Sequence, residues 1–115
     1  MSFDDFEVVA YKIMAYLSSC LKGGVTPNVA KARELSRVNG LYFDAVVSSL
    51  FDKGLVSGNL IRDMNGEPIE ICSLTLTLDG AIFLKENSRM AKVRETLGDA
   101  FERVLSAAAA ASSLL

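Results

Sequence analysis

Four cationic side chains are spaced so that they could contact phosphate groups. Lys31, Arg33 and Arg37 recur within residues 27–37, which predict a helix, and Arg62 follows in a predicted β-hairpin. Lysine and arginine bind the phosphates of a DNA duplex and so fix the position of a protein on it. If this chain binds DNA, we expect the helix to contact the backbone and Arg62 to reach a minor groove.

Contacts to base edges would have to come from the next predicted helix, residues 41–53. The polar side chains expected on its outer faces are Tyr42, Ser48 and Ser49. Their hydroxyl groups donate or accept hydrogen bonds equally well, so they discriminate bases weakly.

Two carboxylates on this second helix oppose the DNA interpretation. Asp44 and Asp52 would be held near phosphates and would repel them, and Lys53 is the helix's single cation. We therefore favour a protein-facing surface formed by Tyr42, Asp44 and Asp52. In that case the cations of the preceding helix only keep the outer face of that helix in contact with water.

Catalysis and metal binding are disfavoured by the residue types present. The chain contains no histidine, so acid–base catalysis would depend on carboxylates or a lysine with a shifted pKa. Cys20 and Cys72 lack the spacing of a metal site, and we expect both to be small core residues in a reducing compartment. No glycine-rich phosphate loop is present, and we expect no cofactor, no metal and no enzymatic activity.

Length and charge limit the class of protein further. The chain has 115 residues, which suits one domain, and its formal net charge is −2. A strong basic excess, typical of many nucleic-acid binders, is missing. The acidic start of the chain is unlike a secretory signal, and no apolar stretch suits a membrane span, so we expect a cytoplasmic protein.

The elements that position these residues are predicted by apolar periodicity and by start and stop signals. A first helix should be capped by Ser2, carry an apolar stripe from Phe3, Phe6 and Ala10 to Leu21, and end at residues 23–24. Its wide apolar surface indicates either deep burial or a shared interface. Thr26 and Pro27 indicate the start of the second helix.

A hairpin and two more helices complete the predicted order. Gly54 ends the third helix, and strands from Leu55 and through Leu76 flank a turn at residues 65–68. The apolar alternation changes phase along the second strand, which predicts either a β-bulge or a wing whose tip leaves the core. Thr77 should cap a fourth helix, residues 78–86. The predicted fold is therefore mainly α with a small antiparallel β-wing: a winged helix-turn-helix with flanking N- and C-terminal helices.

The last predicted helix, residues 89–115, carries an apolar seam. Steps of four and three residues connect the proposed interface residues, which are Leu97, Phe101, Val104 and Ala108. The seam predicts either a homodimer or packing against the first helix of the same chain. Gly98 should weaken this helix by up to about 1 kcal/mol relative to alanine.

The segment that ends the wing resembles a known family. Thr77-Leu78-Asp79-Gly80-Ala81-Ile82-Phe83-Leu84-Lys85-Glu86-Asn87 is similar to the wing end of the YjcQ-like winged-helix proteins of bacterial prophages and their hosts. Leu50-x-x-Lys53-Gly54-Leu55-Val56-Ser57-Gly58 resembles the helix-to-strand junction of that family. The resemblance covers about residues 26–97. It implies a small phage-related winged-helix protein and brings no catalytic motif.

Taken together, these features predict a single domain over residues 1–115, with a core of about 1–88 and a C-terminal helix at 89–115. The function we expect is a homodimeric, non-catalytic protein-interaction module, with a host or phage protein as a further candidate partner. The alternative is a DNA-binding transcriptional regulator that contacts phosphates through its second helix and wing.

Overall fold

Helix α1 (Phe6–Lys22) is the centre of the molecule, and the other elements pack around it. The computed structural model describes residues 5–112 of the chain. From Val8 to Leu17 every residue of α1 is buried, even Lys12, so the wide apolar surface of this helix is explained by deep burial. Phe6 and Leu21, predicted for the core stripe, lie in the first and last turns of α1 and are about half exposed, at 46% and 51%. The predicted cap Ser2 and the apolar Phe3 lie outside the described residues.

Two short helices follow, and their beginnings depend on asparagine caps. Helix α2 (Val29–Ser36) begins after Asn28, whose side chain accepts a hydrogen bond from the Lys31 amide at 3.2 Å. The predicted start at Thr26 and Pro27 is therefore wrong by two residues. Helix α3 (Gly40–Asp52) begins after Asn39, whose side chain accepts from the Tyr42 amide at 2.9 Å.

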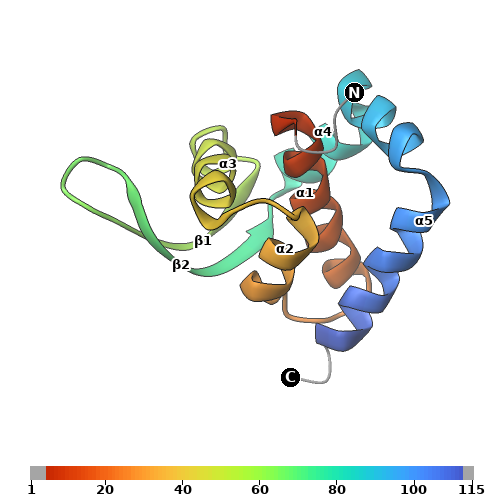
Figure 1. Ribbon diagram of the computed structural model, residues 1–115, viewed down its shortest axis with the longest axis horizontal. Helices are drawn as coiled ribbons and strands as arrows, with labels where there is room; N and C mark the ends of the chain where they lie inside the picture. Colours follow the sequence, from red (N-terminus) through yellow and green to blue (C-terminus); the bar gives the residue numbers. More distant parts are fainter. Residues whose placement is uncertain (1–4, 113–115) are drawn as a thin grey trace.

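The wing is an antiparallel hairpin of β1 (Val56–Arg62) and β2 (Pro68–Leu76), and it projects from the helical body (Figure 1). Its register slips twice, so the predicted bulge is confirmed. At the first slip, Asn59 pairs with Ser73 and Leu60 pairs with Ile71, which leaves Cys72 without a partner across the ladder. Cys72 is exposed, contrary to the prediction of a core residue, whereas Cys20 is buried as predicted.

Helix α4 (Leu78–Glu86) begins at the predicted cap, Thr77. The Thr77 hydroxyl accepts from the Gly80 amide at 2.9 Å and donates to the Gly54 carbonyl at 2.7 Å. The Thr77 amide donates to the Leu55 carbonyl at 3.2 Å. The start of α4 is thereby fastened to the junction between α3 and β1.

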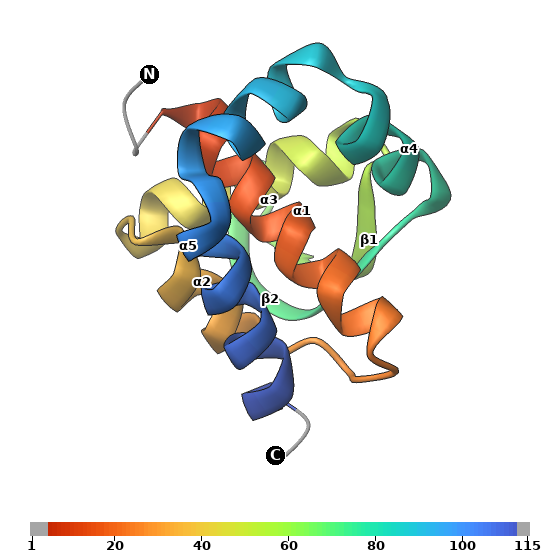
Figure 2. The same cartoon turned by 90° about the vertical axis from the view of Figure 1, so that its right-hand side faces the viewer.

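Helix α5 (Ser88–Ser112) runs along α1 on the side away from the wing (Figures 1 and 2). It bends at Gly98, where φ is 69° and ψ is −168°. Met90 and Val93 are buried before the bend, and Leu105 and Ala108 are buried after it. The architecture is mainly helical with a two-stranded wing, which confirms the predicted fold class. None of the described helices is long and apolar enough to cross a membrane.

Candidate interaction surface on α3 and the wing

One stripe along α3 is formed by the exposed Leu41, Ala45 and Asp52 and the half-buried Ser48. The spacing of four, three and four residues places these side chains on one side of a helix. Leu41 is 84% exposed, Ala45 is exposed, and the Asp52 side chain is 73% exposed. We call these four residues the α3 stripe. Its apolar start and acidic end distinguish it from a surface built for phosphates.

Arg62 on β1 is turned back onto this stripe. Its guanidinium donates to the Ser48 hydroxyl at 2.9 Å and to the Gly66 carbonyl at 2.7 Å, and it pairs with the Asp52 carboxylate at 3.4 Å. Charge-assisted hydrogen bonds of this kind hold an arginine in a fixed orientation. Arg62 therefore joins the wing to the end of α3. In this orientation the guanidinium is bound to α3 and to the turn of the wing.

Arg33 on α2 faces α3 in a similar way. Its guanidinium lies 3.7 Å from the Asp44 carboxylate and 5.1 Å from the centre of the Phe43 ring. The paired Asp44 oxygen is buried and accepts no hydrogen bond, so Arg33 is the cation that compensates its charge. A carboxylate buried without such a partner would be costly.

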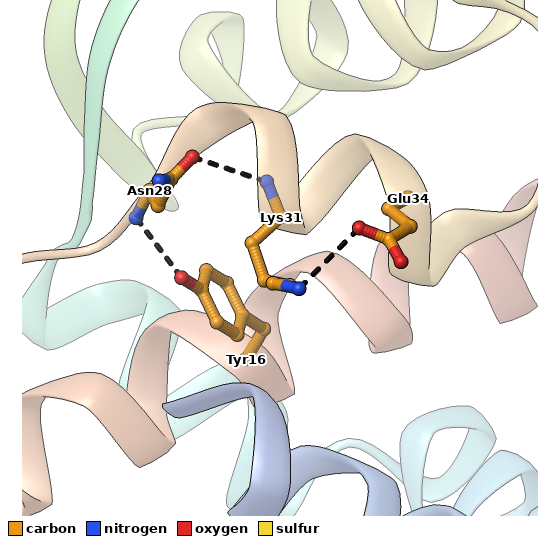
Figure 3. Close-up of polar contacts among 4 residues, drawn as sticks. All are labelled: Tyr16, Asn28, Lys31 and Glu34. Carbon is orange, nitrogen blue, oxygen red and sulfur yellow. Dashed lines mark hydrogen bonds and ion pairs between the residues drawn. The ribbon is translucent and has the colours of Figure 1, made fainter. Parts of the chain in front are cut away.

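The remaining cations of α2 differ from each other. Figure 3 shows Lys31 directed toward Glu34, with Nζ 3.4 Å from the carboxylate. It also shows the backbone N–H of Asn28 donating to the Tyr16 hydroxyl at 2.9 Å. Arg37 is the left-handed C-cap of α2, with φ at 56°. It is exposed, and no carboxylate of residues 5–112 lies within ion-pair distance of it.

The predicted base-contacting residues do not share one surface. Ser48 faces Arg62, whereas the Tyr42 ring lies 6.2 Å from the Phe6 ring of α1. Ser49 borders a small apolar pocket of about 230 Å³ that Phe6 also lines. The predicted protein-facing trio is likewise divided, with Asp52 on the stripe and Tyr42 and Asp44 half-buried on either side of it.

Apolar side chains on the wing were missed by the sequence prediction. Met64 at the tip is fully exposed, Ile69 is 62% exposed, and Ile61 is 48% exposed. Ile69 is the extra residue of the second bulge, because Ile61 pairs with Glu70 and Arg62 pairs with Pro68. The change of phase in the sequence was the signal that could have identified it.

Asp63 has a structural role at the wing tip. Its carboxylate accepts from the Asn65 amide at 2.8 Å and from the Glu67 amide at 3.0 Å. These bonds order the turn in the manner of an Asx-turn. The wing therefore presents a defined tip rather than a loose loop.

The predicted dimer seam on α5 faces α1 of the same chain over much of its length. The Phe101 ring lies 6.1 Å from the Tyr11 ring and 6.0 Å from the Lys12 ammonium. Ala108 is buried and Leu97 is half-buried, whereas Val104 is 48% exposed. Burial lowers the pKa of Lys12, and the nearby charge of Arg37 lowers it further.

No metal site emerges in the described part of the chain. No group of three or more cysteine, aspartate or glutamate side chains among residues 5–112 could hold an ion.

Comparison with known proteins gives one result. The model of the YjcQ protein family matches residues 11–100, which is most of the chain. No curated protein and no solved structure is significantly similar to it.

Proposed function

We propose that this chain, which belongs to the YjcQ family, is a non-catalytic module that binds another protein through the α3 stripe and the wing. One observation carries the proposal. The cations suited to phosphate contacts, Arg33 and Arg62, are paired with the α3 carboxylates Asp44 and Asp52. The surface left exposed is apolar and acidic.

The alternative, a DNA-binding regulator, is less well supported by this arrangement. The Arg62–Asp52 pair, with an exposed carboxylate, is worth only about 0.2–1 kcal/mol, so DNA could displace Asp52 from its arginine. The displaced carboxylate would then lie next to a phosphate and oppose binding. Removing Arg33 from Asp44 would cost more, because the buried Asp44 oxygen would lose its compensating cation. Leu41 and Ala45 carry no group that hydrogen-bonds a base edge. Arg37 is the cation best placed to contact a phosphate.

The chemistry of the expected partner follows from the charges of this region. Residues 40–70 contain five carboxylates and two cations, and exposed apolar side chains accompany them at Leu41, Met64 and Ile69. A partner with a basic rim and an apolar centre would complement both features, and such complementarity speeds association and excludes acidic competitors. A phage or prophage setting and a cytoplasmic location are part of the same proposal.

Two matched variants test the surface. Leu41 and Leu78 are both exposed leucines in the first turn of a helix, at 84% and 76%, but only Leu41 is on the α3 stripe. A partner identified by cross-linking in the source cells and then purified should lose at least about tenfold in affinity for the Leu41→Glu variant, which is about 1.4 kcal/mol. Leu78→Glu should bind as the wild type does. Equal loss in both variants would place the interface elsewhere.

A DNA titration tests the alternative in the same preparation. Fluorescence polarisation with mixed duplexes at about 50 mM salt, a condition that favours phosphate contacts, should show no binding. A salt-dependent affinity that falls in an Arg37→Ala variant would support the regulator and contradict our proposal.

Self-association is the remaining part of the proposal. Phe101 is directed to α1 of its own chain and Ala108 is buried, so a dimer through α5 would depend on the exposed Val104. Light scattering of the wild type and of Val104→Glu tests it. If the wild type is monomeric at high protein concentration, the proposed homodimer is excluded.

A further inference from the structure

A groove with a positive rim lies between α1, α4 and α5, and no residue of α3 or the wing lines it. Its volume is about 510 Å³, within the range of small-molecule sites. The groove, which we call the α1–α4–α5 groove, plays no part in the function proposed above.

The charges on this groove are opposite in sign to those of the whole chain. Lys22, Lys85 and Arg94 line it against one carboxylate, Glu102, whereas the chain as a whole carries 14 acidic and 12 basic side chains. Lys22 and Lys85 lie in the last turns of α1 and α4, where a cation also complements the negative helix end. Arg94 lies within α5, so the helix-end explanation does not extend to it.

Polar and apolar side chains line different sides of the groove. The α1 residues Ser18 and Ser19 line it from one side, and the apolar Leu84 and Leu105 line it from the neighbouring helices. The Arg94 guanidinium donates to the Leu84 carbonyl at 3.3 Å, which anchors its position at the edge. A convergence of cations and hydroxyls beside apolar walls suits a ligand that has one anionic and one apolar part.

The bend of α5 shapes the site. Arg94 precedes Gly98 and Glu102 follows it, yet both line the groove together with Tyr11 of α1. In a straight helix these two residues would lie about 12 Å apart along the axis. Burial raises the pKa of the Tyr11 phenol above its ordinary value.

We propose that the α1–α4–α5 groove binds a small organic anion, a phosphate or carboxylate group on an apolar body. Lys22, Lys85 and Arg94 would bind the anionic group, and Leu84 and Leu105 would contact the apolar body. Glu102 would weaken the binding of any anion and so favour ligands that keep their charge at the lysine side.

Titration of the full chain with three probes tests the site. Phenyl phosphate, benzoate and benzyl alcohol share an aromatic ring and differ in the charged group. We expect saturable shifts of the Ser18, Lys22 and Lys85 amides in ¹⁵N correlation spectra with at least one of the anions, and none with the alcohol. The anion that binds with the lower Kd identifies phosphate or carboxylate as the preferred group.

Charge variants distinguish this site from general attraction. Lys85→Glu should raise the Kd of the preferred anion about tenfold, which corresponds to about 1.4 kcal/mol of binding free energy. Lys92→Glu makes the same charge change at an exposed α5 position that does not line the groove, and it should have little effect. Glu102→Gln should tighten binding. Equal weakening by both lysine variants, or no saturation at millimolar concentrations of any probe, would overturn the proposal.

Discussion

Replacement of Gly80 by alanine should destabilise the fold through a clash with backbone. A Cβ atom at this position would lie 2.0 Å from the Leu55 carbonyl oxygen and 2.8 Å from a methyl carbon of Leu76. The same carbonyl accepts the hydrogen bond of the Thr77 amide. The variant must therefore move the start of α4 away from the α3–β1 junction.

The magnitude follows from three terms. Overpacking of this kind costs about 1–3 kcal/mol. Loss of the Thr77–Leu55 hydrogen bond adds about 1 kcal/mol. The higher helix propensity of alanine offsets this loss of stability by up to about 1 kcal/mol relative to glycine. The expected net loss is about 2 kcal/mol, a large part of the stability of an ordinary domain, which is about 5–15 kcal/mol.

Urea denaturation followed by circular dichroism measures this loss, and thermal unfolding should show a midpoint lowered by about 8 °C. Gly40→Ala is the matched control, because Gly40 also lies in the first turn of a helix but has no heavy atom within 4 Å of the added Cβ. It should be as stable as the wild type or more stable by up to about 1 kcal/mol, because alanine favours a helix over glycine. If Gly80→Ala is as stable as Gly40→Ala, the close approach to Leu55 is not a constraint on the fold.

Three further predictions concern side chains or backbone whose environment the fold determines. Cys72 should react with a thiol reagent in the native protein, while Cys20 should react only on unfolding because burial also raises its pKa; fast reaction of Cys20 would contradict its placement. Between its lowered pKa and 10.5, Lys12 is more protonated in the unfolded chain than in the folded one, so the contribution of Lys12 to stability should rise with pH, while the raised pKa values of Cys20 and Tyr11 contribute the opposite slope. Lys12→Met should lack that rise in urea titrations at successive pH values, and an unchanged slope would exclude Lys12 as its source. Gly98→Ala should cost about 1–3 kcal/mol, because φ of 69° with ψ of −168° is a conformation that only glycine adopts readily. A variant as stable as the wild type would show that α5 can straighten without loss.

Sequence reasoning succeeded where the governing interactions are local. The cap at Thr77, the helix end at Gly23 and the bulge in β2 each depend on residues a few positions apart. The start of α2 failed on the same local scale, because Asn28 competes with Thr26 for the role of cap and only Asn28 accepts the hydrogen bond.

The sign and position of the charges on α3 were known from the sequence, but their partners were not. Arg62 and Asp52 are ten residues apart on a strand and a helix, and Arg33 and Asp44 are eleven apart on two helices. The sequence suggested free cations beside free carboxylates, whereas the packing of α2 and β1 against α3 brings them together. The candidate site changed for this reason from separate charges to a paired surface with an exposed apolar stripe.

By itself, the sequence determined the order and type of the elements and the acidic character of the third helix, because periodicity, caps and charge are properties of neighbouring residues. Only the tertiary structure decided that α5 covers α1 of its own chain, that Gly80 lies against Leu55, and that three cations meet in one groove. These contacts join residues far apart along the chain. Their geometry is set by how whole helices pack, which no local pattern specifies.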